Sequence, residues 1–132
     1  MIETGIDIVE VHRIEKSIEN PTFIRKYYHP IEIEYSATSI NAAQHFAVRF
    51  AAKEAVRKVL LSHIDKLSWT DSWIENDENG KPHLQFSENI LKQVHILSSS
   101  VSLSHSKDQA IAIVLLDVKP FYAKATKGRR KT

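Results

Sequence analysis

The residues best suited to chemistry lie in one stretch, residues 49–58, which reads Arg-Phe-Ala-Ala-Lys-Glu-Ala-Val-Arg-Lys. Glu54 and Lys58 are four residues apart, so on a helix their side chains would be neighbours. Asp7, near the N-terminus, adds a second carboxylate. Carboxylate oxygens suit magnesium and ammonium groups suit phosphate, so these residues suggest a phosphate and magnesium site. The spacing alone favours an ordinary salt bridge between Glu54 and Lys58.

Two elements would have to position these groups. Residues 5–9 alternate as in a short half-buried strand, with Ile6 and Ile8 on one side and Asp7 on the other. A long helix is predicted to begin near Asn41, which with Gln44 resembles a capping box, and to end at about Ser62. The residues of its predicted core stripe are Val48, Ala52, Ala55, Val56, Val59 and Leu60.

Shorter elements complete the pattern. An amphipathic helix is predicted after residue 10, and a second helix follows Asn20-Pro21 and ends by His29-Pro30. A β-hairpin around Asn79-Gly80 joins residues 67–73 to His83–Phe86. A helix from Ser87 or Glu88 through Leu97 precedes strands at 101–104 and 110–118. The sequence therefore predicts a compact α+β single domain in which the longest helix packs on a mostly antiparallel sheet.

Composition narrows the class of protein. The 132 residues include no cysteine, and no apolar run is long enough to cross a membrane, so we expect a cytoplasmic protein. The net charge of +2 hides an asymmetry, because the last fourteen residues contain six Lys or Arg and no acid. We therefore expect a domain at 1–118 and a basic, flexible tail at 119–132. Outside the tail, no surface pattern indicates nucleic-acid binding.

Four motifs carry a resemblance to a known family. They are Gly5-Ile6-Asp7-Ile8-Val9-Glu10-Val11-His12-Arg13-Ile14, Arg49-Phe50-Ala51-Ala52-Lys53-Glu54-Ala55, Gly80-Lys81-Pro82 and Val101-Ser102-Leu103-Ser104-His105-Ser106. In this order they resemble the signatures of holo-acyl-carrier-protein synthase, the small trimeric class of phosphopantetheinyl transferases. The resemblance spans residues 2–118 and leaves the basic tail outside it.

The resemblance implies that the phosphopantetheine arm of coenzyme A moves to a serine of apo acyl carrier protein, with release of adenosine bisphosphate. It implies magnesium held by Asp7 and Glu54, with Lys58 beside the leaving group and Glu54 accepting the serine proton, directly or through a water. The residues that it places against coenzyme A are Arg49, Lys58, Gly80, Lys81, Pro82, His105 and Ser106. Taken singly, Asp7 could instead cap a helix, Arg49 could be a surface arginine and His105 a turn histidine.

The resemblance also implies partners. Arg13 matches a carrier-contacting arginine of the family, and Arg25 and Lys26 could extend a basic patch toward an acidic carrier protein. The same residues could be an ordinary solvated helix face. The family builds its sites at the interfaces of a homotrimer, so we expect a trimer here.

One departure keeps other functions open. Where the family continues its long helix into Phe-Gly-Thr-Gly, this chain reads Val59-Leu60-Leu61-Ser62-His63-Ile64. Glycine amides can approach phosphate closely because no side chain intervenes. A homologue that binds coenzyme A or a carrier protein with weakened transfer activity is therefore the alternative. A nucleic-acid-binding protein that uses the tail is the third hypothesis.

Overall fold

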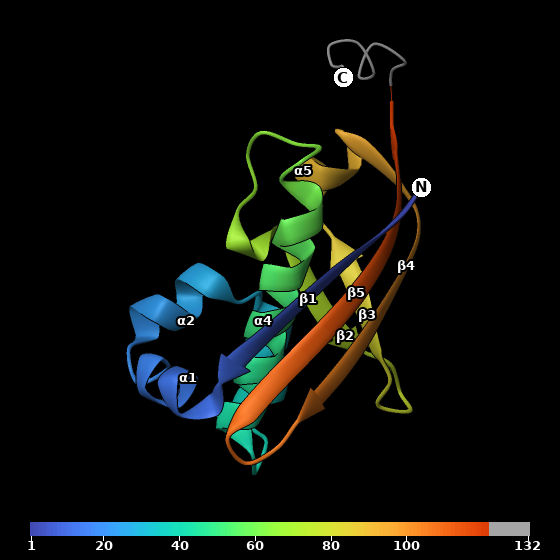
Figure 1. Ribbon diagram of the computed structural model, residues 1–132. Coiled ribbons are helices and arrows are strands. Elements are labelled where there is room, and N and C mark those ends of the chain that lie inside the picture. Colours follow the sequence, from blue (N-terminus) through green and yellow to red (C-terminus); the bar gives the residue numbers. More distant parts are fainter. Residues whose placement is uncertain (122–132) are drawn as a thin grey trace.

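The computed structural model describes residues 1–121. A three-stranded antiparallel sheet crosses one side of a long helix, and a hairpin and short helices surround that helix (Figure 1). In chain order the elements are β1 (Ile2–Glu10), α1 (Val11–Ser17), α2 (Pro21–Tyr27), α3 (Pro30–Ala37), α4 (Ala42–Leu60), a 3₁₀ turn η1 (Trp69–Asp71), β2 (Ser72–Asn76), β3 (Pro82–Phe86), α5 (Glu88–Leu91), β4 (Val94–His105) and β5 (Gln109–Pro120). The α+β class and the packing of the longest helix on an antiparallel sheet are confirmed.

The core lies between α4 and the sheet, whose strand order is β1-β5-β4. The central strand β5 turns Ala110, Ala112, Val114, Leu116 and Val118 inward, and the predicted stripe of α4 is buried against them. Many of these residues are alanines, whose small side chains let the helix and the sheet approach closely. This close approach brings the helix face that carries Glu54 and Lys58 next to β1.

Gly5 makes the closest contact between β1 and α4. A Cβ atom at this position would lie 2.2 Å from the carbonyl oxygen of Ala55 and 3.2 Å from a methyl group of Val59. No side chain fits there, so glycine is required by the approach of the helix backbone. Asp7 lies two residues further along the same face of β1, and Gly5 therefore sets its distance from the helix.

The predicted hairpin is confirmed as β2 and β3, but its first strand starts at Ser72 because Trp69–Asp71 form η1. The predicted strands at 101–104 and 110–118 are parts of the longer β4 and β5. The helix predicted to run to Leu97 is wrong: α5 ends at Leu91, and Val94 pairs with Pro120 in the sheet. Sheet pairing overrides the local helical pattern there.

Two helix starts also differ from the prediction. The capping box at Asn41 is wrong, because its side chain makes no capping bond and Gln44 donates instead to the carbonyl of Ser106 at 3.2 Å. The sequence analysis missed α3, which His29 caps: its Nδ1 accepts the N–H of Ile31 at 3.1 Å, and Glu32 accepts the N–H of His29 at 3.0 Å. Histidine is not among the usual capping residues.

The predicted helices α1 and α2 are present, and Asn20 caps α2 by accepting the N–H of Thr22 at 2.9 Å. The boundary predicted at residue 118 falls within β5, and residues 122–132 of the predicted tail lie outside the described part of the chain. Among the helices of residues 1–121, none is both long and apolar enough to cross a bilayer.

Candidate active site

The first part of the candidate site lies where β1 crosses α4. Asp7 is on the inner face of β1, and one of its carboxylate oxygens lies 3.0 Å from the ammonium of Lys58. Lys58 also donates to the carbonyl of Ile6 at 2.8 Å, so one ammonium spans two consecutive residues of the strand. The side chain of Asp7 is 18% exposed and that of Lys58 is 56% exposed. The pair is therefore open to solvent and to a ligand.

Glu54 lies one helical turn before Lys58 and is half-buried. Within residues 1–121 its carboxylate makes no ion pair, so the salt bridge with Lys58 that the spacing allowed does not form. Asp7 is not a helix cap either, because Glu10 stands at the N-cap of α1. Lys58 therefore compensates the charge of Asp7, whereas Glu54 has no partner of its own among the described residues.

This donor set fits magnesium. The described residues offer no cluster of three or more metal-ligating side chains, and two carboxylates leave coordination positions for water and substrate oxygens, which is how magnesium is usually held. A hollow of about 300 Å³ lies beside Asp7 and Lys58, and Ile6, Ile8 and Ile111 also line it. Asp7 and Glu54 are the residues that would hold the ion.

Arg49 lies deeper in the protein than the sequence analysis allowed. It is 2% exposed, and its guanidinium donates to the carbonyl of His45 at 3.1 Å and to the side-chain oxygen of Asn76 at 2.6 Å. The ring of Tyr35 covers it, with 4.6 Å between the guanidinium carbon and the ring centroid. Burial lowers the pKa of Arg49. The surface-arginine alternative is therefore wrong.

Asn76 links Arg49 to the Gly80-Lys81-Pro82 motif. While its side-chain oxygen accepts from Arg49, its amide donates to the carbonyl of Gly80 at 3.0 Å. Gly80 has φ of +84°, a conformation that favours glycine, so the hairpin turn depends on this residue. Lys81 and Pro82 lead into β3, and with Ser99 and Ser100 of β4 they line a hollow of about 310 Å³.

His105 and Ser106 lie at the turn between β4 and β5. The imidazole of His105 is exposed and makes no hydrogen bond with the described residues, whereas the hydroxyl of Ser106 accepts the N–H groups of Asp108 and Gln109, each at 3.2 Å. The ring of His105 lies 6.1 Å from that of His45, measured between centroids. The structure thus brings His105 close to the segment that carries Arg49, although 56 residues of chain separate them.

The predicted docking residues lie on the outer faces of α1 and α2. Arg13 is exposed, and its guanidinium carbon lies 5.5 Å from the ring centroid of Phe50. Arg25 and Lys26 are exposed in the last turn of α2. Because Phe50 belongs to α4, this contact ties the basic surface to the helix that carries Glu54.

The turn at residues 61–64, which stands where the family has Phe-Gly-Thr-Gly, is hydrogen-bonded to the end of α4. The N–H groups of Leu61, His63 and Ile64 donate to carbonyls of the last turn of α4, at 2.8–3.0 Å. The imidazole of His63 meets the carboxylate of Glu3 at 2.6 Å. Three of its backbone amides are therefore engaged within the protein rather than directed at a ligand.

Comparison with known proteins identifies the family. The family model of the 4'-phosphopantetheinyl transferase superfamily, ACPS, matches residues 3–114. The chain belongs to this family. It is 39% identical over 120 residues to the holo-[acyl-carrier-protein] synthase of Geobacter sp. (strain M21), a match that covers 86% of this chain and 96% of the relative.

Solved structures of the family have the same fold. A holo-(acyl-carrier-protein) synthase from Bacillus anthracis, in complex with CoA (3',5'-ADP), matches with a TM-score of 0.70 and 34% identity over 86% of this chain and 93% of that one. The holo-[acyl-carrier-protein] synthase of Helicobacter pylori, in complex with coenzyme A, matches with a TM-score of 0.75 and 32% identity over 87% and 100%. This phosphopantetheinyl transferase is therefore an enzyme of the holo-acyl-carrier-protein synthase class.

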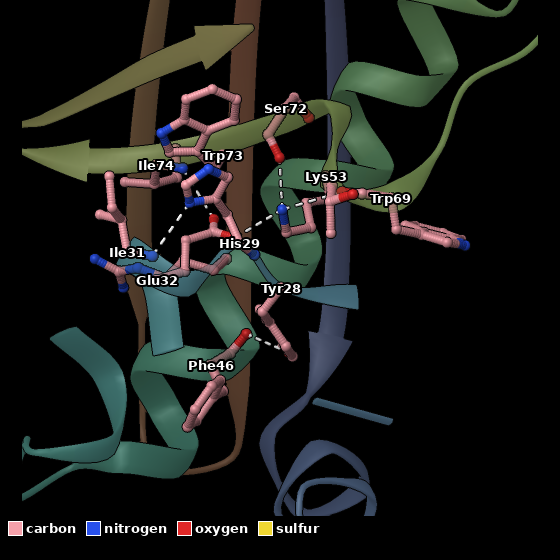
Figure 2. Close-up of polar contacts among 12 residues, drawn as sticks. Tyr28, His29, Ile31, Glu32, Phe46, Lys53, Trp69, Ser72, Trp73 and Ile74 are labelled. Atoms are coloured by element: carbon pink, nitrogen blue, oxygen red, sulfur yellow. Dashed lines mark hydrogen bonds and ion pairs between the residues drawn. The ribbon is translucent and has the colours of Figure 1, made fainter. Parts of the chain in front are cut away.

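In this transferase Lys53 has a structural role that sequence reasoning missed. Its ammonium lies 2.7 Å from the carboxylate of Glu32 and also donates to the carbonyls of Trp69 and Ser72, as Figure 2 shows. The second carboxylate oxygen of Glu32 accepts the N–H of Ile74 at 2.9 Å. Burial lowers the pKa of Lys53, and Glu32 opposes that shift. This buried pair joins α3, α4 and the hairpin behind the site.

The sequence analysis also missed Tyr35, His45 and Asn76, the three residues around Arg49. A signal for one of them was present, since His45 is four residues before Arg49 and so lies one turn away on the same helix face. Tyr35 belongs to α3, a helix that was not predicted. Asn76 ends β2, and an asparagine at the end of a strand usually indicates only a turn. Only the fold brings these residues together.

Proposed function

We propose that this transferase moves phosphopantetheine from coenzyme A to a serine of apo acyl carrier protein at a magnesium site formed by Asp7 and Glu54. The observation that carries the proposal is the contact of Asp7 on β1 with Lys58 on α4 beside an open hollow, with Glu54 one helical turn before Lys58. Two carboxylates and one solvent-exposed ammonium are the groups that phosphoryl transfer needs for positioning and charge compensation.

In the proposed reaction the serine oxygen forms a bond to the phosphorus next to pantetheine, and the phosphorus–oxygen bond to the leaving adenosine bisphosphate breaks. Glu54, which has no partner among the described residues, accepts the serine proton. Lys58 leaves Asp7 and compensates charge on the leaving phosphate. Magnesium, when bound, would neutralise the diphosphate and orient it.

The remaining assignments place coenzyme A along the cleft between the hairpin and β4. Lys81 and Pro82 line the hollow there, Gly80 shapes the turn, and His105 and Ser106 lie at the end of β4. Arg49 contributes its charge from beneath Tyr35. The exposed residues Arg13, Arg25 and Lys26 form the docking surface for the acidic carrier protein.

We further propose a homotrimer with the sites at its interfaces. The outer face of the sheet exposes Ile6, Ile8, Ile113 and Leu115, and the strand register places Ile6 opposite Ile113. Ile6, Ile8 and Ile111 also line the hollow beside Asp7, so a second copy packed on this face would help to close the site. The proposed location is the cytoplasm, where coenzyme A and newly made carrier protein meet.

A second candidate is a coenzyme A or carrier-binding homologue with weakened transfer, and the closed turn at 61–64 favours it, because its engaged amides are poor phosphate donors. Intact-mass spectrometry of apo carrier protein incubated with the enzyme, coenzyme A and magnesium separates the two. A phosphopantetheine-sized gain that disappears with chelator and in Glu54→Gln supports the transferase. Carrier binding without any gain, across several apo carriers, supports the weakened homologue.

The third hypothesis, nucleic-acid binding through the tail, concerns residues that lie mostly outside the described part of the chain. It predicts affinity for DNA or RNA that falls steeply with salt and is lost when residues 119–132 are removed.

A further inference from the structure

Arg49 is a buried cation without a carboxylate partner among the described residues. Its two terminal nitrogens bond to neutral oxygens of His45 and Asn76, and its Nε is buried without a hydrogen-bond partner in residues 1–121. The buried carboxylate of Glu32 is already paired with Lys53. A buried charge is costly unless it is compensated, so this region favours an incoming anion.

His45 lies between Arg49 and the exposed His105. Its ring is 5.5 Å from that of Tyr35 on α3 and 6.1 Å from that of His105 on β4, in both cases edge-to-face. Among the described residues, the ionisable groups packed against it are Tyr35, Arg49 and His105, and none of them is a carboxylate. Burial lowers the pKa of His45, and the charges of Arg49 and His105 lower it further.

A single phosphate oxygen can accept a hydrogen bond from each of the two imidazoles. Hydrogen bonds from each ring nitrogen to a shared oxygen would be about 2.7–3.0 Å long, and this length is compatible with ring centroids 6.1 Å apart after small rotations. A phosphate dianion beside His45 would raise the pKa of its imidazole, because a negative charge favours the protonated ring. The neighbouring cations now have the opposite effect. Binding of the anion and protonation of the ring would then be coupled.

We propose that His45 is a substrate-positioning residue that takes up a proton as a phosphate group of coenzyme A enters between it and His105. The inference rests on the proposed function, in which coenzyme A is the donor. The phosphomonoester of coenzyme A is the group concerned, because it carries two charges and ends the molecule, whereas the diphosphate is needed beside Asp7. His45 therefore contributes to the discrimination between coenzyme A and dephospho-coenzyme A.

The test is calorimetric titration of coenzyme A and of dephospho-coenzyme A into the full chain, in buffers of different ionisation enthalpy, from pH 6 to pH 8. His45→Phe keeps an aromatic ring against Tyr35 and His105 but removes the titrating group. His95→Phe is the matched control, because His95 is ten residues from His105 along β4, roughly 33 Å away. Circular dichroism confirms that each variant is folded.

We expect the wild type to take up protons when it binds coenzyme A, and most of this uptake to vanish in His45→Phe but not in His95→Phe. The preference for coenzyme A over dephospho-coenzyme A should rise severalfold from pH 8 to pH 6 relative to His45→Phe; a pKa shift of one unit limits this rise to about tenfold, which is reached only well below the pKa of the free enzyme. Equal uptake and equal pH profiles in wild type and His45→Phe would overturn the role of His45.

Failure of the proposed function gives a different result. If the wild type binds both forms of coenzyme A equally at every pH and still modifies the carrier, the phosphate subsite is refuted while the transferase stands. If the wild type binds neither form, both proposals are refuted.

Discussion

Gly5→Ala is the substitution that most sharply links the fold to the site. The new methyl group would lie 2.2 Å from the carbonyl oxygen of Ala55, where an ordinary contact is about 3.4 Å or longer, so β1 and α4 must separate by about 1 Å. Overpacking of this kind costs about 1–3 kcal/mol of unfolding free energy, of which reduced chain entropy in the unfolded state offsets about 0.5 kcal/mol. We therefore expect a loss of about 0.5–2.5 kcal/mol.

The effect on transfer should be larger than the effect on stability. Asp7 moves with β1 while Glu54 and Lys58 stay on α4, and a displacement of 1 Å in a reacting geometry can reduce the rate by about a hundredfold. Urea unfolding measures the first quantity, and carrier modification followed by intact-mass spectrometry measures the second, at a temperature where the variant is folded. Lys66→Ala, at an exposed position in the loop after α4, is the control and should change neither.

Two outcomes would refute this reasoning. Unchanged stability would mean that the strand and helix do not meet at Gly5 as described. A destabilised protein that retains the full transfer rate at low temperature would mean that the spacing between β1 and α4 does not control the reaction.

Three further predictions concern the buried pair, the histidines and the docking surface. Lys53→Met should lower the unfolding free energy by about 3–5 kcal/mol in urea titrations, because it leaves Glu32 buried without its cation; a loss below 1 kcal/mol would contradict the role of the pair. Burial lowers the pKa values of His29 and His45, so the unfolded chain binds protons more readily and stability should decline as the pH falls below about 6.5. Thermal unfolding between pH 8 and pH 5 measures this decline, and His29→Asn, which keeps a capping acceptor, should flatten part of it; an unchanged slope in that variant would exclude His29 as a source. Arg13→Glu should raise the KM for the carrier protein by about tenfold and leave the affinity for coenzyme A unchanged, since it reverses one charge on the docking surface. Steady-state kinetics with each substrate varied in turn distinguishes this result from an equal loss for both.

Local patterns predicted the parts of the fold that local chemistry controls. The apolar stripe of α4, the Asn20 cap and the Asn79-Gly80 turn each depend on neighbouring residues, and all three are present. The helix at Pro30–Ala37 was missed because its cap is a histidine, whose role becomes visible only when Glu32 completes the box and pairs with Lys53. Long-range pairing similarly decided the start of β4.

The candidate site was predictable to the extent that its residues are close in sequence or match the family motifs. Helix spacing placed Glu54 beside Lys58 but could not reveal that Lys58 binds Asp7, which is 51 residues away and meets it only through the packing of β1 on α4. The burial of Arg49 depends on Tyr35 and Asn76, which come from two other elements. Its charged side chain alone favoured a surface position.

The metal site can be tested without turnover by replacing magnesium with manganese and following its binding by electron paramagnetic resonance in the presence of coenzyme A. We predict one bound ion per site in the wild type and in Lys66→Ala, and loss of that binding in both Asp7→Asn and Glu54→Gln. Wild-type manganese affinity in either of those two variants would contradict the claim that Asp7 and Glu54 together hold the ion for transfer.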